Sequence, residues 1–376
     1  MCHSIHVTHR NQWSQPGKCG LRALLSFVLL LAAASSGAQS QEPATLADPA
    51  PVIEEILVTG EQPGPALWSA TRDGKTLWIL GMHAPLPAKM TWHSREVESR
   101  ISESQVLVRW VQLETDIEAG FFAKLAAAPA VLAVGDNPKG VRLKDRVAPE
   151  AYEQWERLKQ KYIFRRGNSV ETLRPAFAAS ELRSQAMTRT GLSSPKPGAV
   201  VWPALERLAK KHKVKILEPE VRMSIQIDKP REVARRFREA QLGDAECFAK
   251  SLARLVADLD SMKTHANAWA TGDLEVLRRI PPPDPTVDCE QLLRTLMMNG
   301  SLLKQLGTPE SADEADRARL EFERGLEAVD EVWVSTVEAA LRDHSSVFAL
   351  VPLGALFDAN GPLRVLRDHG FVVVEP

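Results

Sequence analysis

The chain has 376 residues, of which 44% are hydrophobic and 25% are charged, the composition of an ordinary globular protein that can bury a sizeable core. Its 47 Lys and Arg residues nearly balance its 48 Asp and Glu residues, which gives a formal net charge of −1. This balance disfavours nucleic acid and anionic membrane surfaces as partners.

The first forty residues differ from the rest of the chain. They contain basic residues but no acidic residue, and an apolar run at residues 23–34 is followed by the small residues 36–38. The run is too short to span a bilayer, so the pattern predicts a cleaved secretory signal peptide over residues 1–40. An uncut membrane anchor is the alternative. We expect the mature chain in the bacterial periplasm, without a stable transmembrane segment.

Residues 41–65 are rich in Pro, Ala and Glu without sustained periodicity, which predicts a flexible linker. Two β-prone runs at residues 66–70 and 76–80 then flank Asp73-Gly74, a strong signal for a hairpin. The second run is apolar and leads directly into a turn rich in Gly and Pro at residues 81–87. In α/β proteins such strand-to-turn junctions commonly hold the functional site.

The middle of the chain is predicted to be mostly helical. A helix begins after Ser94, with Val97 and Ile101 on one face, and residues 106–111 form a second strand. From residue 116 to about residue 340 we expect a large helical insert. Its predicted elements are helices at residues 151–162, 170–190, 200–212, 230–240, 244–271 and 317–341, and a short strand at residues 213–217.

The chain closes with a strand at residues 347–351, a helix at 362–369 and a strand at 371–374. This order predicts the parallel β-α-β unit of α/β folds. The predicted fold is therefore an α/β domain over residues 66–376, with a central mixed sheet built from the N- and C-terminal segments around the helical insert.

Two of the four cysteines, Cys2 and Cys19, leave with the signal peptide. Cys247 and Cys289 remain, both in the helical insert, and an exported protein matures in an oxidising compartment. We predict a disulfide between them. Two separate thiols are the alternative.

Four stretches resemble a known family: Leu67-Trp68, residues 77–87, the run AWATGDL at residues 268–274, and residues 347–374. Together they resemble the TraB/GumN family of secreted or membrane-linked α/β proteins, which are related to the Tiki metalloproteases. The resemblance covers nearly the whole predicted mature chain. It implies an α/β core and a site at the ends of its strands.

The resemblance also implies a metal site made of a Gly-x-x-His after the first strand, a Glu in the second strand and another Gly-x-x-His after the late strand. Two imidazoles and a carboxylate suit a divalent metal that activates water. In this sequence the three positions fall on Ala84, Trp110 and Ala355. Neither an alanine methyl nor an indole can coordinate a cation. We therefore expect no metal, no cofactor and no catalytic residues, with Trp110 packed between the two alanines as an apolar plug.

A further departure concerns the Arg-Asn pair that often precedes a late Trp in the family. It falls on Val329-Asp330, before Trp333.

Relocated ligands are the alternative to a lost site. A one-residue shift would place His83 at the first ligand position, although neighbouring residues of a strand face opposite sides. Asp358 and Glu114 could supply a displaced carboxylate, or they are surface charges. Trp92 could line the vacated cleft together with Trp110 and bind an apolar or sugar-like ligand. The alternative is that Trp92 packs in the core.

Two classes of function follow. The first is a non-catalytic periplasmic protein with a scaffold or ligand-binding role, whose ligand or protein partner the sequence does not name. The second is a metal-dependent hydrolase, similar to a protease, with relocated ligands. We favour the first.

Overall fold

The computed structural model describes residues 64–90, 92, 95–118, 135–163, 169–193, 198–226, 230–280, 288–289, 291–292, 295 and 309–376. The predicted signal peptide and most of the predicted linker lie outside the described residues. Among the residues that are described, no helix combines the length and the apolar character needed to cross a membrane.

The predicted hairpin is confirmed. Strands β1 (Leu67–Arg72) and β2 (Lys75–Met82) pair antiparallel and leave only Asp73 and Gly74 in the turn. Both turn residues have positive φ angles, 52° and 74°, as a type I′ turn requires. Glycine adopts this conformation without steric cost, which explains the Asp-Gly sequence at the turn.

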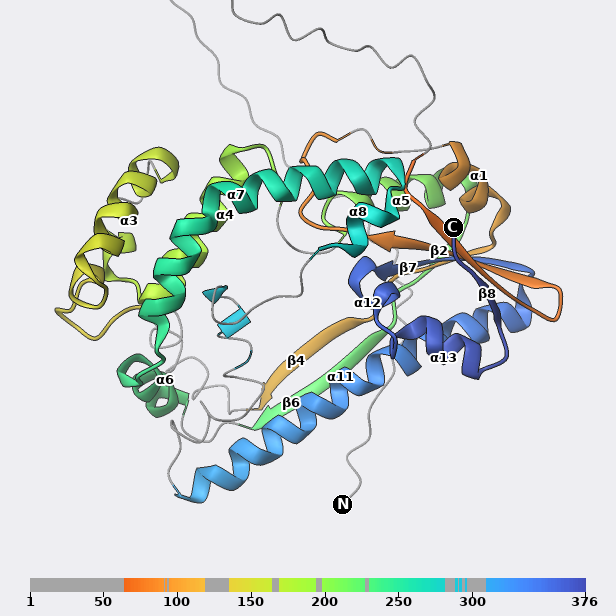
Figure 1. The fold of residues 1–376 in the computed structure, drawn as a ribbon. Helices are drawn as coiled ribbons and strands as arrows, with labels where there is room; N and C mark the ends of the chain where they lie inside the picture. Colours follow the sequence, from red (N-terminus) through yellow and green to blue (C-terminus); the bar gives the residue numbers. More distant parts are fainter. Residues whose placement is uncertain are drawn as a thin grey trace, which may run out of the picture. The chain divides into compact units, whose positions relative to one another are not determined.

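The central sheet has six strands in the order β5-β3-β7-β2-β1-β8 (Figure 1). The remaining strands are β3 (Val106–Val108), β5 (Lys215–Leu217), β7 (Ser346–Pro352) and β8 (Val372–Val374). Strands β5, β3, β7 and β2 are parallel to one another, whereas β1 is antiparallel to both β2 and β8. The mixed α/β sheet built from both ends of the chain is confirmed, and β8 runs parallel to β7 with β2 and β1 between them.

The core of the sheet is formed by the apolar runs that predicted its strands. Leu77 and Ile79 of β2 are fully buried, as are Phe348 and Leu350 of β7. Helices that contact these strands include α1 (Arg95–Glu103), α5 (Val201–His212), α11 (Pro309–Asp343) and α12 (Leu353–Phe357).

A second, two-stranded parallel sheet was not predicted. It pairs β4 (Gln112–Glu118) with β6 (Glu220–Gln226) and packs on α11. We expected helix from residue 116, but β4 continues to Glu118. Its four acidic or amide side chains are rare in strands, and its partner is distant in sequence, so local preference did not reveal the pair. A Cβ at Gly325 of α11 would clash with Met223, which shows how closely the helix approaches this sheet.

The insert is mostly helical, as predicted. Its other helices are α3 (Pro149–Tyr162), α4 (Pro175–Arg189), α6 (Pro230–Glu239), α7 (Asp244–Thr271) and α8 (Leu274–Arg278), with short 3₁₀ turns at Leu143–Asp145 and Ser169–Thr172. The single helix predicted at residues 170–190 is wrong in one respect, because the chain breaks before Pro175. Proline disfavours helical geometry in the preceding residue, and Arg174 is extended, with ψ at 154°. The last helix, α13 (Pro362–Asp368), packs against α11 and β8.

A buried carboxylate ties α3 to the turn that precedes α4. The Glu171 side chain accepts hydrogen bonds from Trp155 Nε1 at 3.0 Å, Tyr152 OH at 3.0 Å and Lys159 Nζ at 2.6 Å. Burial would raise the pKa of Glu171, but these donors outweigh it and the pKa is lowered. Glu171 is therefore charged and fully partnered inside the helical part.

Candidate functional site

Three neighbouring parallel strands end at one edge of the sheet. Met82 at the end of β2 pairs with Pro352 at the end of β7, and Val108 at the end of β3 pairs with Ala349 of β7. In open α/β sheets the carboxyl ends of parallel strands are where ligands bind. We call this edge the carboxyl edge. It is the candidate functional site.

The three positions singled out by the resemblance all follow these strand ends. Ala84 lies two residues after β2, Trp110 two residues after β3, and Ala355 within α12, which begins directly after β7. The chain topology therefore brings the three positions to the carboxyl edge. The packing of Trp110 between the two alanines stays a prediction.

The first strand-to-turn junction is held tightly at Gly81. A Cβ at this position would lie 2.7 Å from Leu353 Cδ1 and 3.3 Å from Trp68, so the close approach of α12 requires glycine. On the carbonyl side, buried Trp269 of α7 donates its indole N–H to Gly81 O at 2.7 Å. The AWATGDL run thus supplies the side chain that fixes the end of β2.

Replacing Trp269 with Phe is expected to lower the free energy of unfolding by about 1–3 kcal/mol, because a buried hydrogen bond and part of a packed ring are lost. Denaturant unfolding measures the change. Trp202→Phe is the matched control, since half-buried Trp202 also packs against the core and stacks on Arg109, but has no hydrogen bond through its indole in the described part. Equal losses in the two variants would contradict the role assigned to the Gly81 hydrogen bond.

The turn after β2 is clamped by the segment that follows α4. Leu86 N donates to Ser193 Oγ at 3.2 Å, and Ser193 N donates to Leu86 O at 2.7 Å. Pro87 and Leu192 form an isolated bridge, and the Ala84–Pro85 peptide bond is cis. The turn is therefore held before Ala84 by the hydrogen bond to Gly81, and after Ala84 by the contacts of Leu86 and Pro87.

His83 lies in this turn and faces a second histidine that sequence reasoning missed. Its ring centre is 6.3 Å from that of His265 on α7, and the ring planes are 82° apart. Burial and the neighbouring His265 lower the pKa of His83 to about 4, and burial also lowers the pKa of His265. Both imidazoles are neutral near pH 7. His265 is four residues before Trp269, a spacing that places both side chains on one face of α7 and was a usable signal.

Trp110 lies against the long helix α11. Its ring centre is 5.7 Å from that of Trp333, which is fully buried. Trp110 itself is half-buried, and the guanidinium of its neighbour Arg109 stacks on Trp202 and pairs with Glu218 at 2.6 Å. Aromatic rings and one ion pair thus surround the end of β3.

The late turn brings two carboxyl groups near each other. Asp358 is exposed and accepts a hydrogen bond from Asn360 N at 2.9 Å. Burial raises the pKa of Asp330 on α11, and the charges of Asp358 and Glu331 raise it further. Asp330, singled out above as part of the family's Arg-Asn position, therefore lies beside this turn, a proximity that the sequence did not indicate.

Trp92 is 4% exposed and packs against Trp269, with ring centres 5.4 Å apart. Its proposed place on a cleft wall stays a prediction, and its observed partner is a core residue.

The residues at the three positions singled out by the resemblance are unsuited to binding a metal. Alanine and tryptophan at positions 84, 110 and 355 offer no lone pair for a cation. Within the described ranges, no group of three or more His, Cys, Asp or Glu residues could hold a metal ion.

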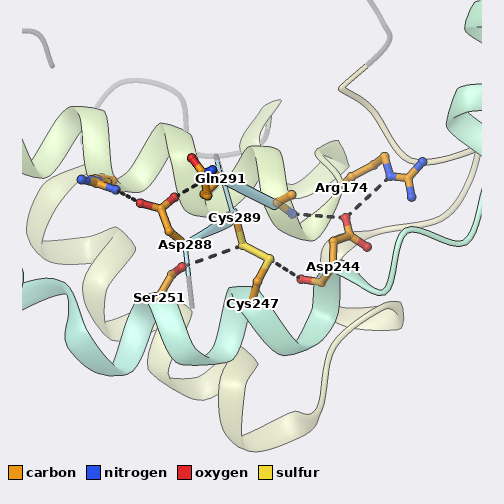
Figure 2. Close-up of a disulfide and its surroundings, with 9 residues drawn as sticks. Arg174, Asp244, Cys247, Ser251, Asp288, Cys289 and Gln291 are labelled. Carbon is orange, nitrogen blue, oxygen red and sulfur yellow. Dashed lines mark hydrogen bonds and ion pairs between the residues drawn. A yellow bond between two sulfur atoms is a disulfide. The ribbon is translucent and has the colours of Figure 1, made fainter. Parts of the chain in front are cut away.

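The predicted cysteine pair lies far from this edge in the chain, in the helical insert. Cys247 of α7 and Cys289 are bonded through their sulfur atoms at 2.06 Å (Figure 2). Ser251 Oγ approaches Cys289 Sγ at 3.8 Å, and Asp288 forms an ion pair with Arg183 of α4 at 2.6 Å. The disulfide therefore fastens residues 288–289 to α7, and the ion pair fastens them to α4.

The order of strands, the helical insert and the position of the carboxyl edge define a mixed α/β protein with a candidate site at the ends of parallel strands. The family model described as the TraB/PrgY/gumN family matches residues 66–375, so the chain belongs to this family. This confirms the resemblance found in the sequence. Neither a curated protein nor a solved structure matches the chain.

Proposed function

We propose that this chain is a non-catalytic member of its family that keeps the α/β core as a scaffold or a binding surface. The observation that carries the proposal is the set of residues after the three strand ends. Ala84, Trp110 and Ala355 follow β2, β3 and β7, which are adjacent in the sheet, and none of them can coordinate a metal or transfer a proton near pH 7.

The surroundings of these positions support a binding role more than a catalytic one. Aromatic side chains gather near the ends of β2 and β3, with Trp110 and Trp202 half-buried and therefore able to contact a ligand. Aromatic faces with a few polar groups suit apolar or sugar-like ligands. The proposal places the protein in the periplasm, which the signal-like residues 1–40 support.

A metal-dependent hydrolase with relocated ligands is the second candidate. His83 lies one residue from the first family position, and Asp330 and Asp358 are close enough to raise the pKa of Asp330. These groups provide two kinds of ligand, although within the described residues they do not form a set of three.

Metal content separates the two candidates. Protein purified without chelator and without added metal is expected to contain no stoichiometric zinc or manganese, measured by plasma mass spectrometry. One equivalent of tightly bound divalent metal would overturn the proposal in favour of the hydrolase. The triple variant Ala84→His, Trp110→Glu, Ala355→His provides the comparison, because it restores ligands at all three positions, and Ala84→His alone is its control.

A further inference from the structure

The His83 and His265 imidazoles are brought together from two parts of the chain that are distant in sequence. His83 follows β2, and His265 lies on α7 one turn before Trp269, which binds the carbonyl of Gly81. The two rings therefore meet where α7 is fastened to the end of β2. Both residues are half-buried.

One nitrogen of the pair has no partner among the described residues. His83 Nε2 is buried, and no hydrogen bond to it is found in that part of the chain. A buried polar atom left without a partner costs about 1–3 kcal/mol, and an unsatisfied atom in a native protein commonly marks a bound water or ion. His265 Nε2 is 3.5 Å from Ser261 Oγ, the long limit of a hydrogen bond, so this ring is held loosely.

The distance between the rings fits a bridging ion. A metal–imidazole bond is about 2.0–2.1 Å long, so two imidazoles bound on opposite sides of one ion have ring centres roughly 6 Å apart. The observed distance is 6.3 Å. A direct N–H···N hydrogen bond would bring the ring centres closer by about an ångström. Because both pKa values are lowered, neither nitrogen needs to lose a proton before it binds.

The number of ligands selects the class of ion. Structural zinc is almost always bound by four ligands, and no third His, Cys, Asp or Glu joins this pair within the described ranges. A monovalent ion with a filled d shell, such as Cu⁺ or Ag⁺, is satisfied by two nitrogen ligands in line. We propose that His83 and His265 form a two-coordinate site for a soft monovalent cation of the copper class.

Silver is the probe of choice because it needs no reductant. Reductants that keep copper monovalent could open the Cys247–Cys289 disulfide and create thiol ligands. The experiment titrates Ag⁺ as nitrate into the full chain in chloride-free buffer and follows the heat by calorimetry. The test variants are His83→Gln and His265→Gln. His344→Gln, at the end of α11, is the matched control.

The wild-type chain and His344→Gln are expected to bind one Ag⁺ with equal affinity, and each test variant to bind at least tenfold more weakly. Circular dichroism checks the fold of each variant, and the partly exposed His265 carries the test if His83→Gln fails to fold. Equal affinity in all four proteins would place the ion elsewhere, for example on methionine sulfur, and would overturn the proposal. No binding to the wild type would also overturn it. The zinc and manganese contents test the proposed function separately. Failure of the silver-site proposal therefore does not imply failure of the proposed function, and the reverse also holds.

Discussion

Replacing Arg174 with Met is expected to lower the free energy of unfolding by about 3–5 kcal/mol, because it removes one partner of a buried ion pair. Arg174 and Asp244 have side chains 0% and 5% exposed, with Nε and Oδ2 3.7 Å apart (Figure 2). Without Arg174 the buried Asp244 carboxyl group would lose its cationic partner. The midpoint of denaturant unfolding, followed by far-UV circular dichroism, measures the loss.

The same arginine also satisfies the end of a helix. Its guanidinium donates to the carbonyl oxygens of Phe237 and Ala240, at the C-terminal end of α6, the second at 2.8 Å. Phe237 O also accepts a 3.3 Å hydrogen bond from Ala240 N, but carbonyls in the last turn of a helix lack their usual partners four residues on, and a cation is favoured at this end of the helix dipole. Asp244 in turn accepts a hydrogen bond from Ala176 N at the start of α4, at 3.2 Å. Loss of Arg174 therefore affects the end of α6 directly, and the starts of α4 and α7 through Asp244.

Two further variants isolate the buried pair. Arg183→Met removes an arginine that also pairs with an aspartate, Asp288, but is one-third exposed, so it is expected to cost below about 1 kcal/mol. The double variant Arg174→Met, Asp244→Leu removes both buried charges, and its loss should be smaller than the sum of the two single losses. If Arg174→Met cost no more than Arg183→Met, the stabilising role assigned to the buried pair would be wrong.

Removing the disulfide is expected to have a similarly large effect. The double variant Cys247→Ala, Cys289→Ala should lose about 4 kcal/mol in the chain-entropy account, because the bond closes a loop between residues that are 42 positions apart. The unfolded chain gains the freedom of that loop. Thermal and denaturant unfolding of the variant and of the non-reduced wild type measure the loss.

The intact mass of the purified protein before and after reduction and alkylation provides the chemical check. We expect no reaction of these cysteines with an alkylating agent unless the protein is first reduced. Asp288→Asn is the control, since it removes the ion pair with Arg183 but leaves the bond in place, and it should cost below about 1 kcal/mol. Two free thiols in the non-reduced protein would show that the bond does not form.

The sequence was sufficient where the signal is local. Asp73-Gly74 predicted the hairpin because only that turn chemistry matches the twist of paired strands. The helix predicted at residues 244–271 was found with the same bounds, because Gly272, with φ at 73°, ends it and Asp273 caps the next helix through Val276 N. The predicted cysteine pairing needed only two remaining cysteines. The three positions at the carboxyl edge were named from the family resemblance alone, and the structure places each of them after the end of a strand.

Only the tertiary structure decided which side chains meet. Four observed interactions join residues that are distant in the chain. They are the β4–β6 strand pair, the contact of His83 with His265, the proximity of Asp358 to Asp330, and the hydrogen bonds from Arg174 to the end of α6. A local window of sequence encodes turn chemistry, periodicity and caps, which depend on near neighbours. Long-range contacts depend instead on how whole elements pack. In a local window of sequence, a histidine or arginine with a distant partner therefore looks the same as one on the surface.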